Sequence, residues 1–275
     1  MSDRDTLARV FWLGGMSGVG KTTAARALAR RHDLRLYSFD AYNFAHAPLL
    51  PRETRTLDEI WVDTTPEELA DWFGERSRAR FPLVLADLLA LDDEAPLIVD
   101  GPQLLPELVA PLAASPAHVL YVVASRSMQE PLVRARGSGV SSKVRDPERA
   151  RLNRLGRDEE LVRRLRAGAA EHGFRLAEVA DVTETLPTIE RHFEPSLGEW
   201  IAMPHGDVSR RRRDENDARL FQWHAYNDAM GVEPSGELDF ACECDTPGCA
   251  LFATRGLAEA EAARARGEQL LATEH

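Results

Sequence analysis

The stretch Val10–Leu28, VFWLGGMSGVGKTTAARAL, decides how the rest of the chain is interpreted. Its centre, Gly15–Thr22, fits the pattern G-x-x-x-x-G-K-[ST] at every fixed position. In such a loop, backbone N–H groups and the start of the following helix surround phosphate groups. The apolar run Val10–Leu13 predicts a strand before the loop, and Thr22–Arg31 predicts a helix after it. This order of strand, loop and helix favours a phosphate site over a simple glycine-rich turn.

The loop supplies most of the predicted nucleotide contacts. We expect Lys21 to bridge phosphate oxygens as a catalytic cation, and the Thr22 hydroxyl to hold Mg²⁺. The chain uses arginine almost everywhere, and its only lysines are Lys21 and Lys143. A compact ammonium suits this position better than a planar guanidinium, which supports a working loop. The predicted nucleotide-binding residues are Gly15, Met16, Ser17, Gly18, Val19, Gly20, Lys21, Thr22, Thr23 and Arg126.

Apolar segments alternate with helical ones along the next part of the chain. Further strands are predicted at 35–39, 97–100, 117–124 and 174–179. Helices are predicted across much of 41–95 and 126–166, with a clear helix start at 65–68. Such alternation predicts an α/β fold: a three-layer sandwich with a five-stranded parallel sheet covered by helices on both faces.

Two acidic residues close predicted strands. Asp40 follows the second strand, and Asp100 ends the third. Ligands of parallel sheets bind beyond the carboxyl ends of the strands, so both are expected beside the loop. We expect Asp40 to align or deprotonate an attacking hydroxyl, with helix capping or an outer role near Mg²⁺ as alternatives. Asp100 is expected to orient Mg²⁺ or its waters, unless it only serves the turn before Gly101.

A basic stretch follows the fourth strand. Residues 126–166 hold twelve basic and six acidic side chains. Most of these arginines are expected on a solvated helix face, but phosphoryl transfer needs cations around the developing charge. Arg134 and Arg136 precede a flexible Gly-Ser-Gly segment suited to a lid, and we predict catalytic roles for them. Further candidates to contact phosphate are Arg149, Arg151, Arg154 and Arg157.

The bulk properties exclude some classes of protein. The formal net charge is −11 and the pI is about 5.3, which argues against coating nucleic acid or an anionic membrane. We find no apolar run near the ~20 residues of a membrane span, nor a signal peptide. An odd number of cysteines, three, fits no closed disulfide framework. We therefore expect a cytoplasmic protein.

These motifs together resemble the small P-loop kinases, which include adenylate, shikimate and gluconate kinases and chloramphenicol phosphotransferase. The resemblance covers residues 8–193 and rests on GGMSGVGKTT, the acids that close two strands, and the arginine-rich stretch. It implies a P-loop NTPase fold, ATP with Mg²⁺ as cofactors, and phosphate transfer to a small-molecule hydroxyl or phosphate. Asp40 matches the acceptor-side aspartate of the kinases that phosphorylate hydroxyl groups. No motif identifies the acceptor.

The remaining third has a different character. We predict a kinase-like domain over 1–194, a linker over 195–208, and a small, mostly helical C-terminal region over 209–275. Helices are expected at 214–230 and 257–271. Arg210–Arg213 near two aromatic residues suggest nucleic-acid contact, but acids follow at once, so a helix start with paired charges is the simpler interpretation.

The segment FACECDTPGCALF contains a C-x-C-x4-C cluster. Cys242, Cys244 and Cys249 are candidate zinc ligands, with His224 or His205 as the fourth. The spacing differs from the usual C-x2-C pair, so small buried cysteines in a turn-rich segment remain an alternative. The cluster resembles a short cysteine-rich module of bacterial regulatory proteins, and this likeness implies no particular chemistry.

Two functions are consistent with these patterns. The first is an ATP- and Mg²⁺-dependent phosphotransferase acting on a small molecule. The second is an ATP-binding regulatory protein whose nucleotide state is sensed by the cysteine-bearing C-terminal region. Asp40 and the basic stretch have no obvious use in a pure switch, so the sequence favours the phosphotransferase.

Overall fold

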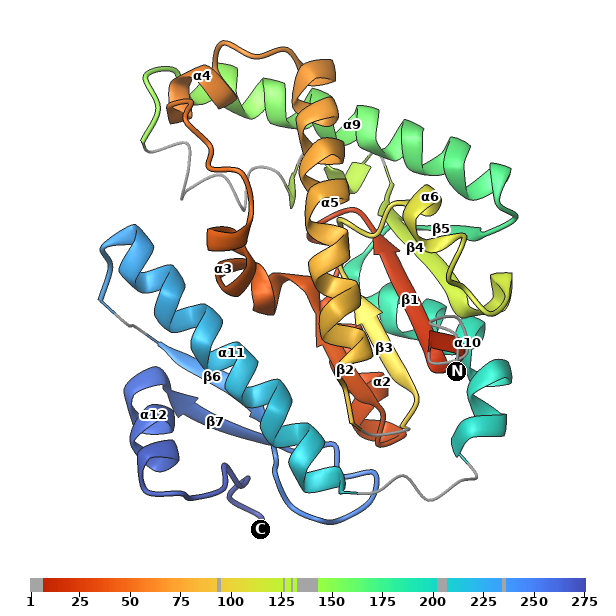
Figure 1. Ribbon diagram of the computed structural model, residues 1–275, viewed down its shortest axis with the longest axis vertical. Helices are drawn as coiled ribbons and strands as arrows, with labels where there is room; N and C mark the ends of the chain where they lie inside the picture. The colour runs from red at the N-terminus through yellow and green to blue at the C-terminus, as the bar shows by residue number, and fades with distance from the viewer. Residues whose placement is uncertain are drawn as a thin grey trace.

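A computed structural model describes residues 7–92, 95–125, 127–129, 131–132, 143–201, 207–233 and 236–275. The predicted α/β fold with a five-stranded parallel sheet is confirmed, and the strand order is β2-β3-β1-β4-β5 (Figure 1). The strands are β1 (Val10–Gly15), β2 (Arg35–Ser38), β3 (Leu97–Asp100), β4 (Val119–Ala124) and β5 (Arg175–Val179). Every residue of β1, β3 and β4 is buried, which explains their continuous apolar runs.

Helices cover both faces of this sheet. The helices α2 (Lys21–Arg31) and α10 (Thr185–Ile201) pack together on one face, and α5 (Pro66–Leu89) and α9 (Pro147–Glu171) pack together on the other. Neighbouring side chains of β1 point to opposite faces, as the pleat requires. The Phe11 ring therefore contacts Phe193 of α10, whereas the Trp12 ring contacts Phe81 of α5.

Short elements join the strands and long helices. The chain passes from β2 to α5 through η2 (Phe39–Tyr42), α3 (Asn43–His46), η3 (Ala47–Leu49) and α4 (Leu57–Trp61). Elsewhere the short elements are η1 (Leu7–Arg9), α6 (Pro106–Val109), η4 (Pro116–His118) and η5 (Val182–Glu184). The helix start expected at 65–68 is confirmed, because Thr65 and Glu68 form a reciprocal capping box.

The linker predicted over 195–208 is wrong in its first half. The helix α10 continues through Pro195 to Ile201. A stripe of Ile189, Phe193 and Leu197, each 0% exposed, fastens this helix to the core. Pro195 is exposed on the outer side of the helix. The free energy gained by burying the three apolar side chains exceeds the cost of the backbone hydrogen bond that proline cannot donate.

The C-terminal region contains more than helices. It comprises α11 (Val208–Met230), an antiparallel pair β6 (Glu237–Ala241) and β7 (Phe252–Gly256), and α12 (Leu257–Ala265). The sequence interpretation missed the strand pair, started α11 six residues late at 214, and extended α12 to 271. The α11 helix starts early because the Asp207 side chain caps it by accepting from the Arg210 amide, at 2.8 Å.

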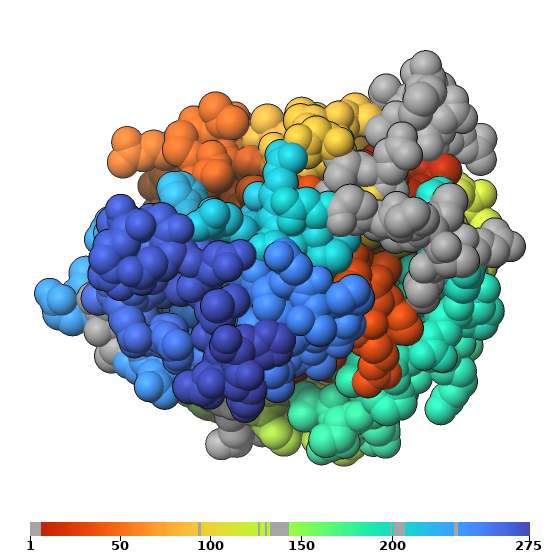
Figure 2. All heavy atoms as spheres, turned by 90° about the horizontal axis from the view of Figure 1, so that it is seen from below, coloured from red at the N-terminus to blue at the C-terminus, as the bar shows by residue number. Residues whose placement is uncertain are grey.

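This region packs closely on the N-terminal part of the chain. Seen from below, its atoms form one continuous surface with those of the first third of the sequence (Figure 2). Arg26 of α2 donates to Glu215 of α11 at 2.6 Å, and the Arg30 guanidinium lies 3.8 Å from the centre of the Phe252 ring. The α11 helix also runs along β2, η2 and α3, the elements that surround Asp40.

Candidate functional site

The glycine-rich loop turns sharply between β1 and α2. Gly15 has a φ of +113°, and a Cβ at this position would lie 2.1 Å from the Val122 carbonyl oxygen of β4. Gly20, with a φ of +83°, is the N-cap of α2 and provides no side-chain cap. The first N–H groups of α2 have no intrahelical acceptors, so they form a ready site for an anion.

A cleft of about 630 Å³ opens at this loop and gathers the main predicted residues. Its lining includes Ser17, Gly18, Gly20, Lys21, Thr22, Thr23, Asp40 and Asp100. The Lys21 side chain is buried at 5% exposure, and its Nζ donates to the Met16 carbonyl oxygen at 2.5 Å. Gly15, Met16 and Val19, also predicted as nucleotide contacts, do not line this cleft, and Val19 is fully buried.

Thr22 and Asp100 meet at the floor of the cleft. The Thr22 hydroxyl donates to Asp100 Oδ2 at 2.6 Å, and the other carboxylate oxygen has no hydrogen-bond partner among the described residues. The pKa of Asp100 is raised to about 6. Burial is the main cause and the charge of Asp40 adds to it, whereas the Thr22 hydrogen bond and the charge of Lys21 act in the opposite direction. A hydroxyl beside a carboxylate with a free oxygen fits Mg²⁺, which prefers oxygen ligands.

Asp40 lies at the mouth of the same cleft. It belongs to η2, directly after β2, and strand pairing places Ser38 opposite Asp100. Asp40 is exposed, so its carboxylate is accessible to a ligand. The buried Arg80 of α5 holds the backbone of η2 by donating to the Phe39 carbonyl oxygen.

A second cavity, of about 310 Å³, adjoins the cleft. Thr22 and Asp40 line both spaces, and α11 forms the opposite wall with Arg219, Gln222, Trp223 and Tyr226. Burial lowers the pKa of Arg219 to about 10, and its Nε has no hydrogen-bond partner in the described part of the chain. The sequence interpretation gave this helix no part in the nucleotide or acceptor site.

A third cavity, of about 150 Å³, lies between α5 and α9. It shares Ser17 and Pro102 with the cleft, and much of its lining is apolar, with Met16, Phe73 and Leu161. It does not contain Asp40. The cleft itself is also lined by Val182, Thr183 and Leu186, just after β5. Sequence reasoning missed these three, although their place after the last strand was a usable signal.

The basic stretch is more neutralised than expected. Several arginines of 143–171 pair with acids, and none of these lines the cleft: Arg145 with Asp63, Arg151 with Glu148, Arg157 with Asp158, Arg163 and Arg164 with Glu160, and Arg166 with Glu178. Arg126, Arg134 and Arg136, for which catalytic or nucleotide contacts are predicted, lie outside the described residues.

The cysteines gather at one point of the C-terminal region. Ligand atoms of Cys242, Cys244 and His275 lie within 4.8 Å of one another, an arrangement that could hold a metal ion such as zinc. Cys249 Sγ lies 3.9 Å from His275 Nε2. Burial acts to raise the pKa of the Cys244 thiol, but hydrogen bonds from the Thr246 amide and the other two cysteines outweigh it, and the pKa falls below its usual value.

Of the two histidines expected to complete this cluster, His224 lies elsewhere. His224 pairs with Asp228 at 3.2 Å and with Glu261 at 3.1 Å, on the exposed side of α11. His205 lies outside the described residues. His275 is near in space but distant in sequence, so spacing alone could not identify it.

The chain gives no match to models of known protein families, nor to curated proteins. Across the described residues, no helix combines the length and the apolar character that crossing a membrane requires. Function must therefore be inferred from the chemistry of the cleft.

Proposed function

We propose that this protein is an ATP- and Mg²⁺-dependent phosphotransferase with a P-loop NTPase fold, acting on a small molecule. One observation carries the proposal: a single cleft at the start of α2 contains Lys21, Thr22, Asp40 and Asp100. A cation, a hydroxyl–carboxylate pair suited to Mg²⁺ and a separate accessible carboxylate are the groups that phosphoryl transfer requires.

Each group has a distinct role in the proposed reaction. Lys21 and the N–H groups of α2 bind the phosphates, and Thr22 with Asp100 holds Mg²⁺, which neutralises charge on the phosphate oxygens. Asp40 orients the acceptor hydroxyl and receives its proton. A bond forms from the acceptor oxygen to the γ-phosphorus while the bond from that phosphorus to the bridging oxygen breaks, and ADP leaves.

The cavity walled by α11 is the proposed acceptor site. It meets the cleft at Thr22 and Asp40, where the transferred group would pass. The Trp223 and Tyr226 rings lie 5.8 Å apart and offer an apolar surface, and the half-buried Arg219 supplies a cation. We therefore propose an acceptor that carries a hydroxyl, a flat or apolar body and an anionic or strongly polar group.

The regulatory function remains a second candidate because α11 contacts α2 directly. Arg26, one turn beyond Thr22, donates to Glu215 of α11 and to the Asp239 carbonyl oxygen of β6. A nucleotide that reorients the start of α2 would act on the C-terminal region through this residue.

A phosphate-transfer assay distinguishes the phosphotransferase from the regulatory protein. The protein, Mg²⁺ and γ-labelled ATP are incubated with pooled nucleosides, nucleotides, sugars, sugar acids and aminoglycoside- or phenicol-type alcohols. We predict label in one pool, with kcat lowered about 10²–10³-fold or more by Lys21→Ala and by Asp40→Asn. Asp71→Asn and Lys143→Ala are matched controls at exposed positions and should retain activity.

A second outcome of this assay would contradict the proposal. If ATP binds tightly in the presence of Mg²⁺ but no pool accepts label, the phosphotransferase proposal fails. Hydrogen exchange of the C-terminal amides with and without ATP then tests the regulatory function.

A further inference from the structure

Four metal-ligating side chains converge where three segments of the C-terminal region meet. Cys242 and Cys244 follow β6, Cys249 lies in the connection to β7, and His275 lies beyond α12. The three cysteines are 0%, 9% and 8% exposed, and Ala272, Leu251 and Leu271 pack against them. Cys242, Cys244 and His275 are within 4.8 Å of one another, and Cys249 adjoins His275 at 3.9 Å.

Two of the three sulfurs accept a hydrogen bond from an N–H group. The Ala272 amide donates to Cys242 Sγ at 3.4 Å, and Arg212 Nη1 donates to Cys244 Sγ at 3.5 Å. Such donors stabilise a thiolate more than a thiol, because hydrogen bonds to an ionised acceptor are stronger. They are also the outer contacts that orient ligands around a metal.

We propose that Cys242, Cys244, Cys249 and His275 bind one Zn²⁺ as a four-ligand structural site. Three sulfurs and an imidazole nitrogen are soft and borderline donors, which select zinc over Mg²⁺ or Ca²⁺. Four protein ligands leave no open position, so the site is structural. On binding, the thiol protons pass to solvent, and metal affinity falls as the pH is lowered.

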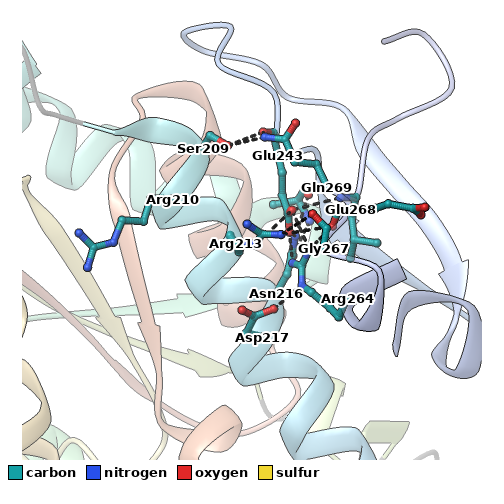
Figure 3. A network of polar contacts seen from close by, with 12 residues as sticks. Ser209, Arg210, Arg213, Asn216, Asp217, Glu243, Arg264, Gly267, Glu268 and Gln269 are labelled. Atoms are coloured by element: carbon teal, nitrogen blue, oxygen red, sulfur yellow. Dashed lines mark hydrogen bonds and ion pairs between the residues drawn. The ribbon is translucent and has the colours of Figure 1, made fainter. Parts of the chain in front are cut away.

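The proposed zinc site would fix the C-terminal tail to the rest of this region. Residues 268–275 form no helix or strand. A polar network around the fully buried Glu243 holds this tail in place (Figure 3). Glu243 lies between the two cysteines of the C-x-C pair. Glu243 accepts from Arg264, from Asn216 at 2.8 Å and from the Leu270 amide at 3.1 Å. Zinc would lock this tail to β6 and the loop before β7.

The site is also joined to the main sheet domain. Arg212 of α11 donates to the Cys244 carbonyl oxygen at 2.8 Å and to Asp33, beyond α2, at 2.7 Å. Small regions with a small core often need a metal or a disulfide for stability. Here the metal would stabilise the region that holds α11 against Asp40.

Metal analysis tests the proposal on the full-length chain. The protein purified with Zn²⁺ should retain one equivalent after dialysis, and Co²⁺ substitution should give the intense visible bands of a tetrahedral site with thiolate charge transfer. Cys249→Ser and His275→Ala should weaken zinc binding at least tenfold in competition with a chelator. His224→Ala, the matched histidine control, should bind zinc as the wild type does.

Several results would overturn the site. If the wild-type protein retains no zinc and shows no tetrahedral Co²⁺ spectrum, the site is ruled out. This result does not depend on the variants, so poor folding of a variant does not affect it. An intact mass two hydrogens lower, with only one of the three cysteines open to alkylation, would identify a disulfide instead. A Cys249→Ser protein with unchanged affinity and spectrum would reduce the site to three protein ligands and contradict the structural role.

Discussion

At the scale of single residues, Asp100 connects the ionisation of the cleft with the stability of the fold. Its carboxyl group is 1% exposed, and burial raises the pKa from 3.8 to about 6. Because the folded-state pKa is the higher one, the group stabilises the fold fully only below about pH 4. This contribution is lost as the pH rises to about 6, which costs up to about 3 kcal/mol at neutral pH.

We predict that Asp100→Asn removes this pH dependence. Relative to the wild type, the free energy of unfolding of the ligand-free variant should rise between pH 4 and 7, by up to about 3 kcal/mol. Urea denaturation across this range measures the difference, with Asp71→Asn as an exposed control. The same variant should lose Mg²⁺-dependent ATP binding. A difference in stability that is constant with pH would show that Asp100 does not titrate as described.

At the scale of elements, α5 positions the short turn η2 that carries Asp40. Four residues of 3₁₀-helix have little stability of their own. Arg80 of α5 donates to the Phe39 carbonyl oxygen, to His46 at 3.1 Å and to Gln103 at 3.0 Å. Its planar guanidinium reaches these acceptors at once, which a lysine ammonium cannot do.

We predict that Arg80→Lys lowers kcat by about 10–100-fold while leaving the KM for ATP unchanged, because a small displacement of Asp40 misaligns the acceptor. Steady-state kinetics measures this split, and Arg163→Lys, exposed on α9, is the control. A rise in the ATP KM with unchanged kcat would indicate that Arg80 serves the nucleotide instead.

At the scale of the whole molecule, the C-terminal region forms part of the proposed site. The acceptor cavity exists only because α11 lies across β2 and η2, so its two walls come from opposite ends of the chain. Binding of the acceptor should therefore depend on side chains that have no contact with the nucleotide cleft.

We predict that Trp223→Ala raises the acceptor KM about tenfold or more and leaves the ATP KM unchanged, since an aromatic anchor contributes about 2 kcal/mol. Phe221→Ala, also exposed on α11 but outside the cavity, is the control. If Phe73→Ala raises the acceptor KM and Trp223→Ala does not, the acceptor binds between α5 and α9.

Sequence alone predicted the features that short patterns determine. The loop and the parallel sheet follow from local spacing. The position of Asp40 and Asp100 beside the loop follows from the rule that ligands lie at the carboxyl edge of such a sheet. The continuation of α10 through Pro195 could not be predicted, because buried contacts far along the chain decide it. For the same reason, His275 as a partner of the cysteines required knowledge of the fold.

The burial of Lys21 offers a labelling tool within the chain. The other lysine, Lys143, is exposed, whereas Lys21 is 5% exposed and lines the cleft. When the chain is treated with an amine-acylating reagent and analysed by mass spectrometry, Lys143 therefore serves as the internal standard and Lys21 as the reporter. The ratio of the two modified peptides would report cleft occupancy for any nucleotide, without a radioactive substrate or a known acceptor.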